Sequence, residues 1–483
     1  MKITRIITLL LLLSFALTAC GNNQTKTDTT QYNSDSSPIS DEDNLYVADL
    51  PEITFDNADF NVVGIMETGL DSTFKFDAEE ASGDVLENAL FKRNRAIEDR
   101  FMVNFNYEIL DQHNKTYTEL NQNVMSDDTV YDMYMLICRN AFKAAQEGLI
   151  YPIDDIPYID LTAPWYIQSI NEQLTIDGKL FFAYSAECLN VYSQSTVVFY
   201  NKQLADEFQL GSLYGTVRDG EWTIDKMLEY ARLVKSSENL GNDTVYGIST
   251  EHDMLYPALW VGSDTRIIEK DEDDIPAYTL TSNEKMLGLL ELAVNIKNES
   301  NLVVNSLRDL EPKERIQGDV LFSENKALFR VAGLCHVSNL RNMKADYGII
   351  PLPKYDTAQE DYVGRMCDGW LYVVPKNSDK LEMTGVLMEA LAAESMNTTI
   401  PAYFDVVLDS KVTRDDEAAE MLDIIFNNIS VDLGDTVWMF AARDKLTTVI
   451  VNGSNQFAST AESMKANVEN EITKAIAALN EIE

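Results

Sequence analysis

The chain has 483 residues and 45% of them are hydrophobic, which is enough for two or three average domains with sizeable cores. Its formal net charge is −41, from 79 acidic and 38 basic side chains. Such a surface repels nucleic acid and other polyanions. It also argues against an anionic solute as ligand, although a local arginine cluster could override the mean charge.

The first twenty residues are typical of a secretory signal. Lys2 and Arg5 precede an apolar run over residues 6–17 that is too short to span a bilayer. The run ends in LTAC at residues 17–20, which resembles the bacterial lipoprotein cleavage box. We therefore expect residues 1–20 to be a signal peptide, Cys20 to become lipidated, and the exported protein to be anchored by lipid at the outer face of the cell membrane.

Residues 21–45 contain almost no apolar side chains, and we expect a disordered tether there. After the tether, strand-like and helix-like stretches alternate. We expect strands at residues 61–66, 103–109, 132–138, 180–184, 195–200, 327–332, 347–351 and 371–375, and helices at 81–100, 141–147, 224–234, 283–297, 416–425 and 464–479. This alternation predicts an α/β protein with mainly parallel sheets whose faces are covered by helices.

Three further predictions concern helix caps, an irregular connection and an acidic loop. Thr223 is a plausible N-cap for the helix that follows it, and Thr413 with Asp416 resembles a capping box. The segment 149–166 is too rich in Pro and Asp to be regular, so we expect an irregular surface connection. The acidic run 269–274 lacks the Gly turn and spaced ligands of a calcium loop, so we expect a solvated loop.

Motifs for catalysis and metal binding are largely missing. The three histidines are isolated, and no HExxH, GxSxG or GxxxxGK[ST] string occurs, so we expect neither a metal site nor a cofactor. A glycosidase stays open, because it needs only two carboxylates about 5–10 Å apart. Four further cysteines lie far apart, and we expect buried thiols, with one disulfide as the alternative; they are Cys138, Cys188, Cys335 and Cys367.

Several motifs taken in order carry a family resemblance. They are RNAFKAAQEGLIYPIDD, PWY, IDGKLFFAYSAECLNVYSQSTVVFYNK, WT followed by YG, and ALFRVAGLCHVSNL followed by DYGIIPLPKYD. Together they resemble the extracellular solute-binding proteins (family 1, maltose-binding-like) of bacterial carbohydrate ABC transporters, over about residues 58–480. The resemblance implies a two-lobed periplasmic-binding-protein-like fold of type II, in which each lobe is a mostly parallel sheet flanked by helices.

In that family a hinge of crossing segments joins the lobes. Here the crossings would fall near residues 184–195, 365–372 and 408–413. The first lobe would then comprise residues 55–190 plus 370–410, and the second residues 191–369 plus 411–483.

Ligands of open α/β folds bind at the carboxyl ends of strands. A sugar needs aromatic rings for its C–H faces and carboxylates or amides for its hydroxyls. Strand ends and crossings supply the candidate ligand-binding residues Glu67, Arg139, Asn140, Glu187, Asn190, Tyr192, His336, Asp368, Trp370 and Trp438. The resemblance supports only the location of these residues at strand ends and crossings, and not the individual ligand contacts. Arg139 could instead pair with a carboxylate, Glu187 could satisfy backbone donors, and we expect Trp165 and Trp222 to be packing residues.

We therefore expect a monomeric receptor that closes two lobes over a carbohydrate, in the first instance an oligosaccharide, and delivers it to the permease subunits of an ABC importer. No catalysis and no nucleic-acid partner are expected. Two alternatives remain at this point: a membrane-anchored carbohydrate-active enzyme, and a receptor for a peptide or other organic solute.

Overall fold

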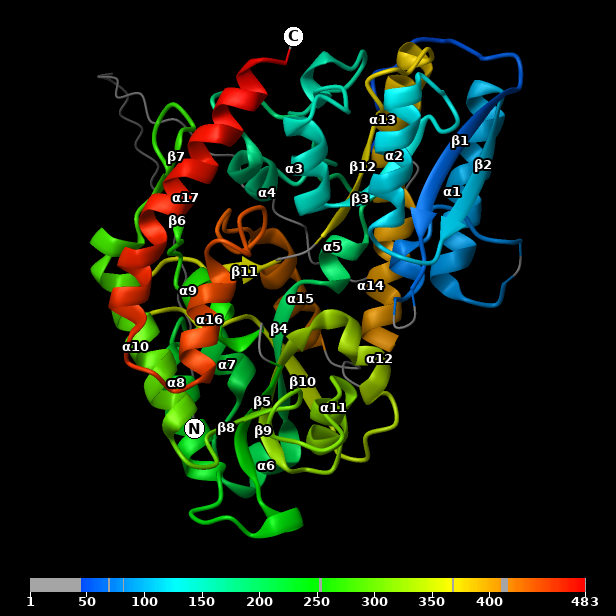
Figure 1. The fold of residues 1–483 in the computed structure, drawn as a ribbon. Coiled ribbons are helices and arrows are strands. Elements are labelled where there is room, and N and C mark those ends of the chain that lie inside the picture. Colours follow the sequence, from blue (N-terminus) through cyan, green and yellow to red (C-terminus); the bar gives the residue numbers. More distant parts are fainter. Residues whose placement is uncertain are drawn as a thin grey trace, which may run out of the picture. The chain divides into compact units, whose positions relative to one another are not determined.

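Two β-sheets organise the part of the chain that the computed structural model describes, which is residues 45–67, 70–80, 82–251, 254–366, 369–409 and 416–482 (Figure 1). The signal peptide, Cys20 and all but the last residue of the tether predicted at residues 21–45 therefore lie outside the described residues, as do Cys367, Asp368 and Thr413. Among the described residues, no helix combines the length and the apolar character needed to cross a membrane.

The first sheet has the strand order β12-β3-β1-β2. Strands β1 (Ala58–Ile65), β2 (Val103–Leu110) and β3 (Met133–Ile137) are parallel, and β12 (Trp370–Val373) joins β3 in the antiparallel direction. The connections β1–β2 and β2–β3 run through helices α1 (Val85–Phe101) and α2 (Lys115–Ser126), as parallel strands require. Every residue of β3 is buried, because it lies between two strands in the interior of the sheet.

The second sheet has the order β13-β11-β4-β9-β5-β8, with β10 paired to β4. Its strands are β4 (Thr196–Asn201), β5 (Tyr246–Thr250), β8 (Val303–Asn305), β9 (Ala327–Gly333), β10 (Tyr347–Ile350), β11 (Gly364–Arg365) and β13 (Ile429–Ser430). Strand β5 is parallel to β8 and β9, whereas β4 is antiparallel to β9, β10 and β11. A separate hairpin consists of β6 (Ile268–Lys270) and β7 (Pro276–Tyr278).

The remaining helices surround these sheets (Figure 1). They are α3 (Cys138–Gln146), α4 (Gln168–Leu174), α5 (Asn190–Ser193), α6 (Lys202–Glu207), α7 (Leu213–Arg218), α8 (Ile224–Val234), α9 (Leu255–Gly262), α10 (Glu284–Asn298), α11 (Ile316–Ser323), α12 (Val337–Leu340), α13 (Leu381–Asn397), α14 (Thr399–Asp409), α15 (Asp416–Asn427), α16 (Arg443–Val451) and α17 (Phe457–Asn480). The Thr223 cap of α8 is confirmed, since its side chain accepts a hydrogen bond from the Lys226 backbone.

The chain passes directly between the two sheets at two places in the described residues. Strand β11 of the second sheet ends at Arg365 and β12 of the first sheet begins at Trp370. Helix α5 precedes β4 and contacts the 3-10 turns Ser72–Phe74 and Leu334–His336, which follow β1 and β9. A strand that enters a sheet without a crossover helix need not share the direction of its neighbours, which accounts for the antiparallel β4 and β12.

The strand predicted at residues 180–184 is wrong, because this stretch is irregular. The backbone N–H of Tyr184 donates to Asn171 Oδ1 (2.8 Å), and its carbonyl accepts from Asn171 Nδ2 (2.9 Å). The Asn171 side chain therefore takes the place of a neighbouring strand. The other predicted strands and helices are present, with shifted ends.

The segment 149–166 is irregular, as predicted, but much of it is not at the surface. Trp165 and Tyr166 are buried, and both donate to the buried carboxylate of Glu389 on α13, at 3.1 and 2.8 Å. Their polar groups thus have a partner inside the protein, which permits burial. The acidic run 269–274 overlaps β6, and its exposed residues are Glu269 and the stretch 271–273. Cys138 and Cys188 are buried, as expected for packed thiols.

Candidate ligand-binding site

The carboxyl edge of the first sheet gathers residues that are far apart in the sequence. Because β1 and β2 are parallel, the segments that follow them lie at the same edge. There Glu67 accepts a hydrogen bond from the His113 backbone, and its Oε1 lies 3.1 Å from His113 Nδ1. The His113 ring meets Trp370 edge-to-face, with centroids 6.5 Å apart. The predicted residues Glu67 and Trp370 are thus brought together by His113, which the sequence analysis left as an isolated histidine.

Trp370 is packed on several sides in this structure. Its ring also meets Phe74 edge-to-face at 6.2 Å, and the residue is 6% exposed. Its backbone N–H donates to Asn190 Oδ1 (2.7 Å), and its carbonyl accepts from Asn190 Nδ2 (3.1 Å). The Asn190 side chain therefore fastens the first crossing to the start of β12. A ligand contact for Asn190 remains a prediction.

Arg139 and Asn140 lie in the first turn of α3, which begins directly after β3, so their strand-end position is as expected. Both are partly buried, and Asn140 Nδ2 donates to Asn114 Oδ1 at 3.3 Å. One turn further along α3, Phe142 meets Trp438 edge-to-face at 5.3 Å. Helix α3 therefore carries two predicted residues and contacts a third, Trp438, through Phe142, although the Trp438 indole itself is buried.

The remaining predicted residues of the first crossing have different surroundings. Tyr192 is half-buried, and its ring contacts Phe426 with centroids 4.9 Å apart. Glu187 is buried, and its Oε1 has no hydrogen-bond partner within the protein. The alternative that Glu187 satisfies backbone donors is therefore not supported for that oxygen atom.

The carboxyl edge of the second sheet carries a buried ionic network. Strands β5 and β9 are parallel, so Glu251, which follows β5, and His336, which follows β9, lie at one edge. His336 Nδ1 lies 2.8 Å from Asp319 Oδ2, and its Nε2 lies 3.5 Å from Glu251 Oε1. Arg330 donates from Nε to Asp319 Oδ1 at 3.0 Å, while its Nη2 is 3.8 Å from Glu251 Oε2.

The pairing shifts the pKa values of His336 and Asp319 toward their charged forms. Burial alone would lower the pKa of His336, but contacts with Asp319 and Glu251 outweigh it and raise that pKa above its ordinary value. For Asp319, burial acts to raise the pKa, and the pairing with His336 and Arg330 lowers it instead. His336 therefore binds carboxylates in this structure rather than standing free for a ligand. Its side chain is 12% exposed.

Five buried polar atoms of this edge have no hydrogen-bond partner within the protein. They are both carboxylate oxygens of Glu251, Arg330 Nη2, Asn305 Nδ2 and Ser306 Oγ. Asn305 pairs with Thr250 in the sheet, and the Ser306 backbone donates to the Thr250 carbonyl at 2.9 Å, so both lie next to Glu251. Buried polar atoms are nearly always satisfied, so this edge is suited to a ligand that both donates and accepts hydrogen bonds.

The sequence analysis missed Glu251, Asp319 and Arg330. Glu251 directly follows β5, and the strand pattern of residues 246–250 was the signal that could have identified it. Asp319 and Arg330 lie on α11 and inside β9, and only the tertiary structure brings them to the edge. Trp222, in contrast, is fully buried and donates to the Pro351 carbonyl at 2.9 Å, so its predicted packing role is confirmed.

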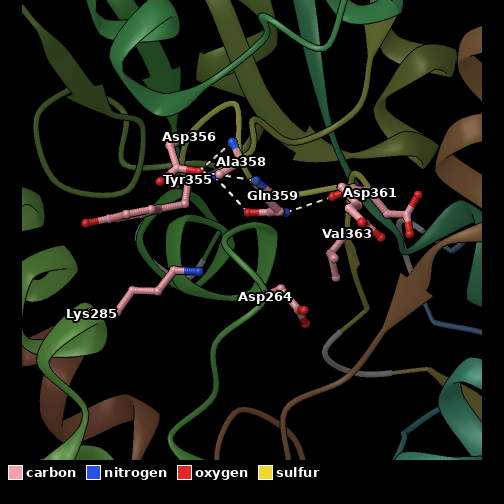
Figure 2. Close-up of a pocket in the computed structure, with 9 residues that line it drawn as sticks. Asp264, Lys285, Tyr355, Asp356, Ala358, Gln359, Asp361 and Val363 are labelled. Carbon is pink, nitrogen blue, oxygen red and sulfur yellow. Dashed lines mark hydrogen bonds between the residues drawn. The ribbon is translucent and has the colours of Figure 1, made fainter.

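Two surface pockets lie on other parts of the described residues. One, of about 560 Å³, is formed by the turn at residues 355–361, which faces Asp264 and Lys285 (Figure 2). Its Gln359 side chain is already bonded to the carbonyls of Gly262 and Asp361, at 2.9 and 2.8 Å. The other, of about 660 Å³, lies over β1 and β2 beside Tyr131. Neither pocket is lined by a predicted site residue.

The fold resembles that of several solved sugar-binding proteins. An extracellular solute-binding protein from Staphylococcus aureus in complex with maltose aligns with a TM-score of 0.59 at 13% identity, covering 89% of this chain and 99% of that one. The sugar-binding protein MalE from Xanthomonas citri gives 0.59 at 14%, covering 86% and 98%. An ABC substrate-binding protein from Listeria monocytogenes in complex with cycloalternan gives 0.54 at 14%, covering 86% and 100%.

At the level of sequence, no protein-family model and no curated protein matches the chain. The structural likeness covers most of the chain, and it confirms the predicted fold class. The protein has the two-lobed periplasmic-binding-protein fold, with helices flanking mostly parallel sheets. The boundaries of the lobes and the ligand contacts of the ten candidate residues remain predictions.

Proposed function

We propose that the protein is an extracellular solute-binding protein that captures a carbohydrate between its two lobes and delivers it to an ABC importer. The observation that carries this proposal is the likeness over at least 86% of the chain to substrate-binding proteins solved with sugars, among them maltose and cycloalternan. Structural neighbours of this kind are binding proteins, which favours a receptor over the enzyme alternative.

The chemistry of the two strand edges agrees with a sugar ligand. The second edge offers acceptors on Glu251 and donors on Arg330 and Asn305 that make no hydrogen bond within the protein, although Glu251 lies within ion-pair distance of Arg330 and His336. A sugar hydroxyl can satisfy both kinds of group at once. Carboxylates that accept from hydroxyls form the stronger, charge-assisted bonds.

The finer parts of the proposal follow the sequence analysis. Residues 1–20 are a signal peptide, Cys20 is lipidated, and residues 21–45 tether the body to the outer face of the membrane. Residues 55–190 with 370–410 form one lobe, and 191–369 with 411–483 the other. Ligand favours the closed form because only that form contacts it from both lobes. The protein acts as a monomer with the permease subunits as partners, and no cofactor takes part.

A thermal-shift screen with oligosaccharides tests the function. A sugar at 100 times its dissociation constant should add about 2.7 kcal/mol to the unfolding free energy, because it binds only the folded state. Chromatography of the same sample after several hours should recover the sugar intact. Stabilisation by peptides but by no sugar would contradict the proposal, and so would cleavage of a stabilising sugar.

The Glu251→Gln variant tests the second strand edge. Losing the carboxylate charge should weaken the binding of a stabilising sugar at least about tenfold, because a charge-assisted hydrogen bond contributes roughly 1.5–3 kcal/mol. Glu324→Gln is the matched control, since Glu324 is an exposed residue that pairs with Lys326 at 2.6 Å. Isothermal titration should give the control the affinity of the wild type. Equal affinities for all three proteins would remove Glu251 from the site.

A further inference from the structure

The segment 185–194, within the first crossing predicted at residues 184–195, carries a buried acid that interacts with a buried arginine. Glu187 is 8% exposed and Arg93 on α1 is completely buried. The Arg93 guanidinium donates to neutral groups, namely the Phe76 carbonyl (2.7 Å), Asn94 Oδ1 (2.9 Å) and Ser395 Oγ (3.3 Å). Arg93 therefore ties α1 to the segment after β1 and to α13, and Glu187 is the foremost of the negative groups that favour its charged form.

Other titratable groups interact electrostatically with Glu187. They are Tyr372 of β12, Tyr166 of the segment before α4, and Cys188, its neighbour in the chain; Tyr166 in turn donates to Glu389 of α13. Asp77 also favours the charged form of Arg93. Burial holds the pKa of Cys188 at about 12 and those of both tyrosines well above 10, so these three groups stay neutral near pH 7.

The pKa of the Glu187 carboxyl is raised toward neutral pH. Burial raises the pKa of its carboxyl to about 7, and the attraction of Arg93 opposes this without cancelling it. One of its oxygens, Oε1, has no hydrogen-bond partner within the protein, so no donor stabilises a negative charge there. An ionised Glu187 is therefore poorly accommodated in the packing observed here.

We propose that Glu187 is a proton-sensitive element of the first crossing: when it releases its proton to solvent, residues 185–194 shift toward conformations in which the carboxylate reaches water. The crossing lies where a bound proton can act on the arrangement of both sheets. Helix α5 contacts turns that follow β1 and β9, and Asn190 holds the start of β12. The inference rests on this packing and not on the sugar-binding function.

The size of the effect follows from linkage. In a conformation that exposes Glu187, its pKa returns toward the ordinary value of 4.5, whereas in the packed form it is about 7. Raising the pH from 6 to 8 should then increase the population of exposed conformations about tenfold. Well below pH 4.5 the acid is protonated in both forms, and the equilibrium no longer depends on pH.

Hydrogen exchange of the full-length, ligand-free protein tests this proposal. After correction for the intrinsic chemical rate, the protection factors of residues 185–194 should fall about tenfold between pH 6 and pH 8 in the wild type. The amides of β4, directly after the crossing, should change much less. In Glu187→Gln, which keeps the shape of the protonated acid, the pH dependence of residues 185–194 should disappear.

Glu389→Gln is the matched control, because Glu389 is also a buried acid with a pKa of about 7 but lies on α13. It should leave the pH dependence of the crossing in place. The proposal is overturned if wild type and E187Q show the same dependence, if E389Q alone removes it, or if β4 and the crossing change equally. The last comparison uses only the wild type, so it holds even if a variant folds poorly.

Discussion

Replacing Asp435 by Asn should lower the free energy of unfolding by about 3–5 kcal/mol, since it removes the charge of a buried carboxylate that binds two buried arginines. Asp435 is fully buried and binds Arg365, also fully buried, through both oxygens at 2.6 and 2.9 Å. Arg443 adds a third contact to the same carboxylate at 3.3 Å. Urea unfolding followed by tryptophan fluorescence measures the loss.

Arg443 also binds a second carboxylate, that of Asp444, which supplies the control for the Asp435→Asn variant. Asp444 accepts from Arg443 at 2.9 Å, but its side chain is 42% exposed. Because water already solvates that pair, Asp444→Asn should cost less than about 1 kcal/mol. Comparable losses for D435N and D444N would mean that the buried network contributes little. The network matters for the fold because it links the segment after β13 to β11. Only four residues separate β11 from β12, which belongs to the other sheet.

Replacing Glu389 by Gln should change the pH dependence of stability. Burial raises the pKa of Glu389 to about 7 from an ordinary value of 4.5, although the hydrogen bonds from Tyr166 and Trp165 oppose the shift. Between these two values the folded protein binds a proton that the unfolded chain releases. Stability therefore falls as pH rises from 4.5 to 7, and the whole penalty of about 3 kcal/mol is present above pH 7.

The measurement is chemical unfolding of wild type and E389Q at pH 4.5, 6 and 8. The variant should gain about 3 kcal/mol relative to wild type between the first and last pH, whatever its offset at pH 4.5. Glu382 lies on the same helix and also accepts from a tyrosine, Tyr158, at 3.0 Å, but near the surface. Glu382→Gln should run parallel to the wild type. A parallel course for E389Q as well would refute the prediction.

Local sequence patterns predicted most of the elements around the site. The apolar run at residues 133–138 indicated a buried strand, and Thr223 marked the start of α8, because each signal depends only on neighbouring residues. The pattern failed at residues 180–184, which look like a strand but bond to Asn171. It also did not predict α13, whose apolar content is spread around the helix. Such helices lack the one-sided periodicity on which the prediction relies.

The candidate site was predicted only in part, because sequence patterns describe neighbouring residues and not contacts between distant ones. Positions after strands and in crossings follow from chain order, so Glu67, Arg139 and His336 could be nominated from the sequence. Their partners could not be, because His113 reaches Glu67 and Asp319 reaches His336 only through the packing of separate elements. For Asn190 and His336 the structure adds protein partners that occupy the side chains.

The sequence by itself determined the α/β class, the order of most strands and helices, and the strand ends at which polar groups would collect, since these depend on periodicity and on neighbouring residues. Only the tertiary structure decided which acids are buried, which of them face an arginine, and which polar atoms remain without a partner. Burial and charge pairing depend on residues up to hundreds of positions apart, such as Arg93 and Ser395. Those distant contacts set the pKa values and the hydrogen bonds available to a ligand.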